Sequence, residues 1–349
     1  MKSRRILAAV KYNSTDISAD ISKHLKSISY TDNLSGEADD LQLTLEDCDG
    51  LWQSDWMPEK GALLDVELEQ HNWQRLSALP QRLRLGLFEI DEIVSSGYPS
   101  TAQIKAVSVP DNNTLRGSDR SRSWEKTKLQ VIANDIATAA EMELFWDTEE
   151  NPILDRAEQT EQSDLSFLHA VCVDQGLALK VSDKQIIIFD EQKYESVLPK
   201  ITIVKMGTNY EVEPEMLYIK AGLGYSFRTK IRDIYAACCV SYQQGKTKAK
   251  IEGLFTAENK TGKTLQVSEQ VESVAEALRL AKKRLRDKNK DETTGTVPLV
   301  GNFALAAGST VNVLGFGAFD GRYLIIRATH SVGSSYSTNI EIRRCLDGY

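Results

Sequence analysis

The sequence predicts a mainly β fold in which two β-barrel domains flank a small α/β domain. Runs of alternating apolar and polar residues, the signature of half-buried strands, fill both ends of the chain. Helical spacing of apolar residues is confined to the middle, apart from one long segment at residues 268–288. A length of 349 residues also exceeds what one hydrophobic core ordinarily holds. We therefore expect three domains, at residues 1–112, 113–199 and 200–349.

The first domain is expected to consist of successive strands. Leucine or valine alternates with polar residues at 41–45 and at 64–68, so one face of each strand is buried. The other face of the second strand carries the carboxylates of Asp65, Glu67 and Glu69. A turn at 47–50, with the sequence DCDG, separates the two strands. The remaining expected strands are residues 4–12, 85–94 and 101–109.

The α/β domain begins where residues 110–113, PDNN, break the strand pattern. Thr127 and Gln130 have the spacing of a capping box, and a helix of apolar residues at helical intervals is expected to follow them. Ser163 is expected to cap a second helix, which ends at Gly176. The two halves of the domain have the same order of elements, which is consistent with an internal duplication whose sequences have diverged. The expected strands are residues 142–146, 177–181 and 185–189, the last two as a hairpin.

The third domain combines strands with one long amphipathic helix. The helix at 268–288 carries its apolar residues on one face and ends on the basic run Lys282, Lys283 and Arg284, which suits the negative end of the helix dipole. A basic helix could touch nucleic acid, but packing across a barrel with its charges in solvent is favoured. The first expected strands are residues 201–206, 216–222, 232–243 and 248–256.

The last residues of the chain predict more sheet. A strand at 311–316 is followed by Asp320 and Gly321, which we expect to form a two-residue hairpin turn with positive φ at both positions. The return strand at 322–330 is apolar on both faces, as in a covered sheet, and a strand at 336–344 then alternates. The faces of the return strand are Leu324, Ile326 and Ala328 on one side, and Tyr323 and Ile325 on the other.

Composition and charge exclude several classes of protein. A formal net charge of −8 does not indicate the positively charged surface that binds DNA phosphates, so a protein that recognises a nucleic-acid sequence is not expected. The apolar run at 6–10 is shorter than the roughly 7 residues of a signal peptide. No run reaches the ~18 apolar residues of a membrane span. We expect a cytosolic protein whose five cysteines are buried free thiols.

Motifs of catalysis and cofactor binding are incomplete. The GKT sequences at 245–247 and 262–264 lack the first glycine of a phosphate-binding loop, and the glycines at 222 and 224 lack the third member of a dinucleotide fingerprint. The aspartates at 47 and 49 lack the last ligands of a calcium loop, and the four histidines show no metal-ligand spacing. We expect no enzyme, no cofactor and no metal. Fifty carboxylates leave room for a catalytic acid pair, which nothing in the sequence selects.

Two blocks of sequence carry a family resemblance. GFGAFDGRYLIIRATHSVGSSYSTNIEIRRCLDGY, at 315–349, resembles the carboxy-terminal signature of the late control gene D protein family, the baseplate hub proteins of contractile-tailed phages. ADDLQLTLEDCDGLWQSDWMPEKGALLDVELE, at 38–69, resembles the amino-terminal signature. The motif residues that the resemblance marks for assembly are Asp39, Asp40, Trp52, Trp56, Gly315, Phe316, Asp320, Gly321 and Tyr323.

The resemblance implies a structural protein of a contractile particle. Its barrels would resemble the tail-tube fold, and three chains would form a ring that joins the hexameric tail tube to the central spike. Because the chain ends at Tyr349 without a spike, the spike is expected to be a separate subunit. The protein would assemble in the bacterial cytoplasm with other baseplate subunits and then become part of the particle. Asp65, Glu67 and Glu69 are candidates for an acidic channel wall that repels DNA.

Other functions and settings stay open at this point. A tail-associated cell-wall hydrolase would share the particle but needs a carboxylate or histidine site. A monomeric carbohydrate-binding β protein would need solvent-facing aromatic platforms. The particle could be a phage, a tail-like bacteriocin or another contractile injection system. The tryptophans available for such platforms are Trp52, Trp56, Trp73, Trp124 and Trp146.

Overall fold

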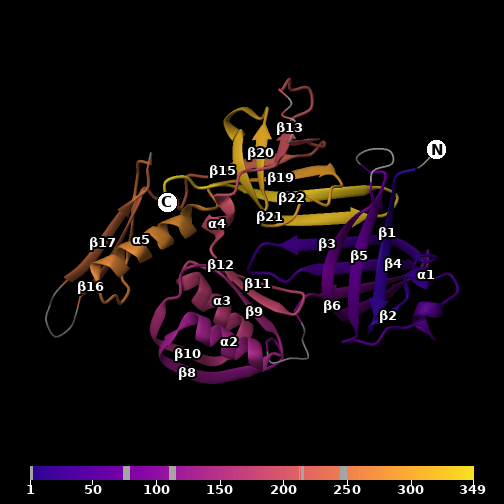
Figure 1. Cartoon of the computed structure of the whole chain (residues 1–349), viewed down its shortest axis with the longest axis horizontal. Coiled ribbons are helices and arrows are strands. Elements are labelled where there is room, and N and C mark those ends of the chain that lie inside the picture. The colour runs from indigo at the N-terminus through magenta and orange to yellow at the C-terminus, as the bar shows by residue number, and fades with distance from the viewer. Residues whose placement is uncertain are drawn as a thin grey trace.

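The computed structural model describes residues 3–73, 79–109, 115–211, 213, 216–243, 250–258 and 260–349. Its regular structure is mainly strand, as predicted. In Figure 1 the amino-terminal strands lie on the right, a unit with two helices lies below, and the carboxy-terminal strands lie above. A further helix packs on strands at the left. None of the helices within the described ranges is long and apolar enough to cross a membrane.

The amino-terminal unit is built from strands whose alternation was visible in the sequence. Leu41, Leu43 and Leu45 are buried in one strand, and Leu64 and Leu68 in the next, in a single hydrophobic cluster. The structure adds a strand at 25–33 that was not predicted. The elements are β1 (Arg5–Tyr12), β2 (Thr15–Asp16), α1 (Ser18–Ile21), β3 (Leu25–Asn33), β4 (Asp40–Glu46), η1 (Leu51–Gln53), β5 (Leu63–His71), β6 (Gln81–Ser96) and β7 (Thr101–Val107).

The middle unit has the two predicted helices, but only one of them is capped as expected. Ser163 Oγ accepts a hydrogen bond from the Ser166 amide at 3.3 Å, as predicted. The capping box at Thr127 is wrong, because its hydroxyl donates to the Glu125 carbonyl instead. The elements are β8 (Asp119–Lys128), α2 (Leu129–Ala139), β9 (Glu143–Asp147), β10 (Ile153–Ser163), α3 (Asp164–Asp174), β11 (Ala178–Ser182), β12 (Gln185–Phe189) and α4 (Glu191–Glu195).

The carboxy-terminal half holds two separate groups of elements. One is a sheet of β13 (Ile201–Val204), β14 (Leu217–Lys220), β15 (Ser226–Thr229), β19 (Thr293–Val300), β20 (Thr310–Leu314), β21 (Gly321–Val332) and β22 (Tyr336–Arg344). The other packs α5 (Val274–Asn289) on β16 (Ala237–Gln243), β17 (Lys250–Thr256) and β18 (Thr264–Val267). The predicted long helix therefore exists, but it begins at Val274 rather than at residue 268. The reason is its cap: Ser273 Oγ accepts from the Glu276 amide at 3.1 Å.

The connection from β20 to β21 differs from the prediction. Asp320 has φ −62° and ψ 147°, which is extended backbone, and Gly321 has φ 140°. Residues 315–320, which include η2 (Gly317–Phe319), form a wider loop, so the two-residue hairpin turn is wrong. The loop is held by Asp320 Oδ1, which accepts a hydrogen bond from the Phe316 amide at 2.6 Å.

The predicted faces of β21 also need one correction. A register shift lies between Ile325 and Arg327 in the pairing with β22. Ala328 therefore joins Tyr323 and Ile325 in one hydrophobic cluster, whereas Leu324 and Ile326 pack in another. Both faces are nevertheless covered, as predicted, because Tyr323, Leu324 and Ile325 are all fully buried.

One branched sheet joins the two ends of the chain. Its main path is β14-β13-β20-β21-β3-β4-β7-β6-β5-β1-β2. The link is the antiparallel pairing of β21 with β3, from Arg327 opposite Asn33 to Val332 opposite Ile28. The pairing of the described strands closes neither end into a barrel, so two closed barrels stay a prediction.

The predicted domain boundaries also remain predictions. Buried apolar residues form distinct clusters in the amino-terminal sheet, the middle unit, the carboxy-terminal sheet and the α5 unit. The last two clusters both fall within residues 200–349. The predicted break at 110–113 and the GKT sequence at 245–247 lie outside the described residues, as do the first two residues of the strand expected at 248–256.

Candidate functional site

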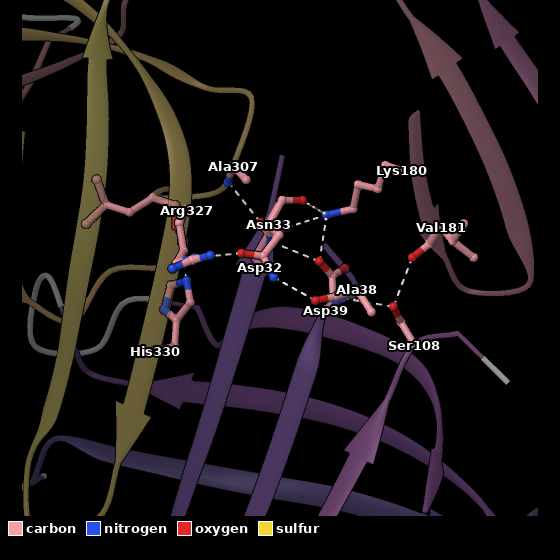
Figure 2. A network of polar contacts seen from close by, with 11 residues as sticks. Asp32, Asn33, Ala38, Asp39, Ser108, Lys180, Val181, Ala307, Arg327 and His330 are labelled. Atoms are coloured by element: carbon pink, nitrogen blue, oxygen red, sulfur yellow. Dashed lines mark hydrogen bonds and ion pairs between the residues drawn. The ribbon is translucent and has the colours of Figure 1, made fainter. Parts of the chain in front are cut away.

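A buried ammonium group connects the units of the chain. Lys180 lies in β11 of the middle unit, and its Nζ reaches into the amino-terminal sheet (Figure 2). There it donates to Asp32 Oδ1, to the Asn33 carbonyl at 2.7 Å and to Asp39 Oδ1 at 3.1 Å. An ammonium has three N–H donors, so these three acceptors satisfy it completely.

The carboxylates around Lys180 extend the network to the carboxy-terminal half. Asp32 Oδ2 accepts a hydrogen bond from the Ala307 amide at 2.8 Å. The Asp39 amide donates to Ser108 Oγ at 3.0 Å, and the Ser108 hydroxyl donates to the Val181 carbonyl at 2.9 Å (Figure 2). Segments that are far apart in the sequence are thus fixed to one another. We call Asp32, Asn33, Asp39, Ser108 and Lys180 the polar junction.

The polar junction carries an excess of buried negative charge. It contains two carboxylates for one ammonium, and Asp39 is only 1% exposed, with no hydrogen-bond partner for Oδ2 among the described residues. Burial raises the pKa of Asp39 to about 6, and the negative charge of Asp32 adds to this shift, whereas the attraction of Lys180 opposes it. Burial lowers the pKa of Lys180, but Asp32 and Asp39 more than offset this and leave it raised. Lys180 is therefore charged at neutral pH, and Asp39 is close to its titration point.

Arg327 and His330 border the polar junction on β21. Arg327 Nε donates to Asn33 Oδ1 at 2.7 Å. His330 is buried, with Nδ1 2.7 Å from the Tyr336 hydroxyl and Nε2 3.0 Å from the Leu305 carbonyl. Burial lowers the pKa of His330, so the ring is neutral at pH 7. These contacts give the histidine a structural role.

A second buried ion-pair network fixes the α5 unit. Arg343 of β22 is 2% exposed and pairs with Glu191 at 2.7 Å and with Glu195, both on α4. Arg286 of α5 reaches the same Glu195 at 2.7 Å. Removing one partner from such a group leaves an uncompensated buried charge, which costs more than a surface pair. The network therefore holds α4, α5 and β22 in one arrangement.

Metal-ligating side chains, thiols and tryptophans in the described residues bear on the alternatives that the sequence left open. No group of three or more His, Cys, Asp or Glu side chains within the described ranges could hold a metal ion. All five cysteines are free, and Cys48 is exposed, which corrects the expectation that every thiol is buried. Among the five tryptophans Trp52 is 6% exposed and Trp56 40% exposed. The other three are partly buried, so they do not form the solvent-facing platforms that a carbohydrate-binding protein needs.

The motif residues singled out in the sequence lie in three places. Asp39 belongs to the polar junction, whereas its neighbour Asp40 is exposed. Trp52 and Trp56 pack edge to face with His24. The carboxy-terminal motif forms a third group, in which Gly315 and Gly321 have positive φ and Asp320 braces the loop. In that group Phe316 packs on Tyr225 and Phe227, and Tyr323 donates from its hydroxyl to the Phe319 carbonyl.

The sequence did not indicate Lys180, Asp32 or Ser108. The alternation of apolar and polar residues in β11 does not show that the Lys180 side chain is buried. Its carboxylate partners are more than a hundred residues away in the sequence. No local spacing signals such a contact. Arg343 alternates with the apolar residues of β22, and this pattern gave no sign that it is buried against α4.

The carboxylates proposed for a channel wall are largely paired with basic groups. Asp65 lies 3.8 Å from both Lys11 and Arg84, and Arg82 lies 2.9 Å from Glu69 and 3.6 Å from Glu67. The basic partners come from β1 and β6, the strands on either side of β5. This face of the sheet is therefore mixed in charge rather than acidic.

Comparison with curated proteins confirms the resemblance to baseplate hub proteins. The chain is 29% identical over 198 residues to a probable baseplate hub protein of Escherichia phage P2, covering 55% of this chain and 48% of that protein. It is 33% identical over 170 residues to a probable baseplate hub protein of Escherichia phage 186, covering 48% of this chain and 41% of that protein. The matches thus span less than half of the length of these relatives. No protein-family model matches the chain.

Solved structures share the fold. A 43 kDa tail protein of prophage MuSo2 from Shewanella oneidensis has a TM-score of 0.70 at 14% identity, covering 98% of this chain and 100% of that one. A tail protein from Neisseria meningitidis has a TM-score of 0.68 at 11% identity, covering 97% and 96%. A component of the Escherichia coli type VI secretion system has a TM-score of 0.57 at 13% identity, covering 100% and 78%.

Proposed function

From its resemblance to baseplate hub proteins, we propose that this chain is a structural hub subunit of a contractile tail or a related injection particle. Three copies would form a ring that joins a hexameric tail tube to a separate central spike. The protein would assemble in the bacterial cytoplasm, with other baseplate subunits as partners, and then become part of the particle. It would act as a scaffold without catalysing a reaction.

One observation carries the proposal: the amino-terminal and carboxy-terminal sheets are continuous through β21 and β3. Each chain therefore offers two β units side by side at a fixed angle, and two units in each of three chains give six. A hexameric tube needs six matching contacts from a three-fold ring. The polar junction supports the same idea, because a scaffold transmits geometry only if its units do not rotate against one another.

The channel wall is part of the same proposal. If the face of β5 with Asp65, Glu67 and Glu69 lines the channel, its carboxylates and the neighbouring arginines give a wall of low net charge. Such a wall would neither bind DNA tightly nor repel it strongly.

Low-resolution imaging of the purified protein tests the proposal. We expect particles that are rings with three-fold symmetry and six density lobes around a central opening. Particles without an opening or with another symmetry would contradict the proposed hub.

A further inference from the structure

A hollow of about 470 Å³ opens in the amino-terminal unit beside α1. Its floor consists of the buried core side chains Leu64, Ile90 and Ile104. Trp52 and Trp56 line its wall. Trp56 remains 40% exposed there, which leaves a large apolar surface in contact with water.

An apolar side chain that enters the hollow would cover the exposed part of Trp56 and remove that surface from water.

The charges around the hollow specify the occupant further. Every charged side chain that lines it is acidic, namely Asp20, Asp55 and Glu59. Asp20 lies 3.6 Å from Lys23, whereas Asp55 and Glu59 form no ion pair with any described residue. The hollow therefore suits an apolar side chain with basic neighbours.

The chain itself offers such a segment. Ile231, in the connection between β15 and β16, is 93% exposed and is the most exposed aliphatic side chain in the described part of the molecule. It stands between Lys230 and Arg232. The Arg232 side chain is 93% exposed and lies 3.7 Å from Asp233.

The two features lie on opposite sides of one molecule. In Figure 1 α1 is at the right margin, whereas β15 and β16 are in the left half. A contact between them must therefore join two copies, and because the two surfaces differ, repetition of the contact produces a ring or an open filament.

We propose that Ile231 of one copy enters the hollow beside α1 of the next copy, with Lys230 and Arg232 facing Asp55 and Glu59. The inference rests on the proposed ring and names the surfaces that close it.

Variants of the exposed turn test the contact by the mass of the assembly in solution. Ile231→Asp places a charge in an apolar pocket and is expected to raise the concentration at which the trimer dissociates by about tenfold or more, measured by light scattering over a dilution series. Leu223→Asp is the matched control, since Leu223 is 87% exposed but has no basic neighbours, and it should leave the trimer intact.

Charge exchange distinguishes this contact from a general loss of folding. Asp55→Lys with Glu59→Lys, or Lys230→Glu with Arg232→Glu, should each raise the concentration at which the ring dissociates, and all four changes in one chain should return it toward the wild-type value. A trimeric wild type whose Ile231→Asp variant dissociates at the same concentration would overturn the inference and leave the proposed function standing. A monomeric wild type would overturn the ring itself and this contact with it.

Discussion

At the scale of single residues, Lys180 determines whether the polar junction is stable. Lys180→Met keeps the length of the side chain but leaves Asp32 and Asp39 as buried carboxylates without a cation. We expect a loss of about 3–5 kcal/mol in the free energy of unfolding at pH 7.5, measured by urea titration. Lys23→Met removes a surface pair with Asp20 and should change it by less than ~1 kcal/mol. Equal effects of the two substitutions would contradict the assigned role of Lys180.

Asp39 gives the junction a pH dependence of known sign. Its pKa is about 6 in the folded chain against 3.8 in the reference state. Between these values the folded state binds the proton and the unfolded state does not, so stability falls as the pH rises through this window and levels off above about 6. The loss amounts to roughly 3 kcal/mol at most.

Asp39→Asn isolates this effect, because the amide keeps an acceptor for Lys180 and cannot ionise. We expect the variant to match wild type near pH 4 and to exceed it in stability above pH 6.5. The two free energies of unfolding, measured across pH 4 to 8, give the difference directly. Parallel curves would show that Asp39 does not titrate in this range.

At the scale of elements, strands with a regularly alternating leucine face were predicted, whereas β3 and the ribbon of β8 and β10 were not. The leucines of β4 and β5 alternate because one face is buried in a core. β8 and β10 pair with each other as a two-stranded ribbon, and most of their side chains are exposed or half-buried. Without a buried face the sequence has no period-2 signal, which explains why both strands were missed.

The helix caps show the same limit of local reasoning. Ser163 and Ser273 each directly precede the helix that they cap, and the Ser163 cap was predicted from the sequence. α2 instead receives its cap from Asn151, whose Oδ1 accepts from the Gln130 amide at 3.1 Å across a loop. The spacing of Thr127 and Gln130 imitated a capping box that the backbone does not use.

Capping substitutions check this assignment. Ser273→Ala and Asn151→Ala should each lower the free energy of unfolding by about 1 kcal/mol, because each leaves a helix amide unsatisfied. Thr127→Ala should change it by less than ~0.5 kcal/mol. If Thr127→Ala lowered the free energy of unfolding as much as Asn151→Ala, Thr127 would be a cap of α2 after all.

At the scale of the whole molecule, the proposed channel wall predicts how the charge on β5 affects the binding of DNA. Wild-type protein should not retain double-stranded DNA at low salt, because basic and acidic groups offset each other on this face and the net charge is −8. Asp65→Asn, Glu67→Gln and Glu69→Gln together free Arg82 and Arg84, and the variant should retain DNA in a salt-dependent manner. Tight retention by wild type in a filter assay would contradict the proposed wall.

The continuous sheet and the buried polar networks describe a chain that holds several units in one arrangement. This is the property that a subunit between a six-fold tube and a central spike requires, and neither network was visible in the sequence. The proposed hub function therefore depends on whether copies of the chain meet as a ring.

The mass of the purified protein in solution tests this claim most directly. Light scattering after size exclusion, at micromolar concentration, should give three times the mass of one chain. An obligate interface of that kind buries upwards of ~2,000 Å² and persists at this concentration. A mass equal to one chain, unchanged when the concentration is raised tenfold, would contradict the account.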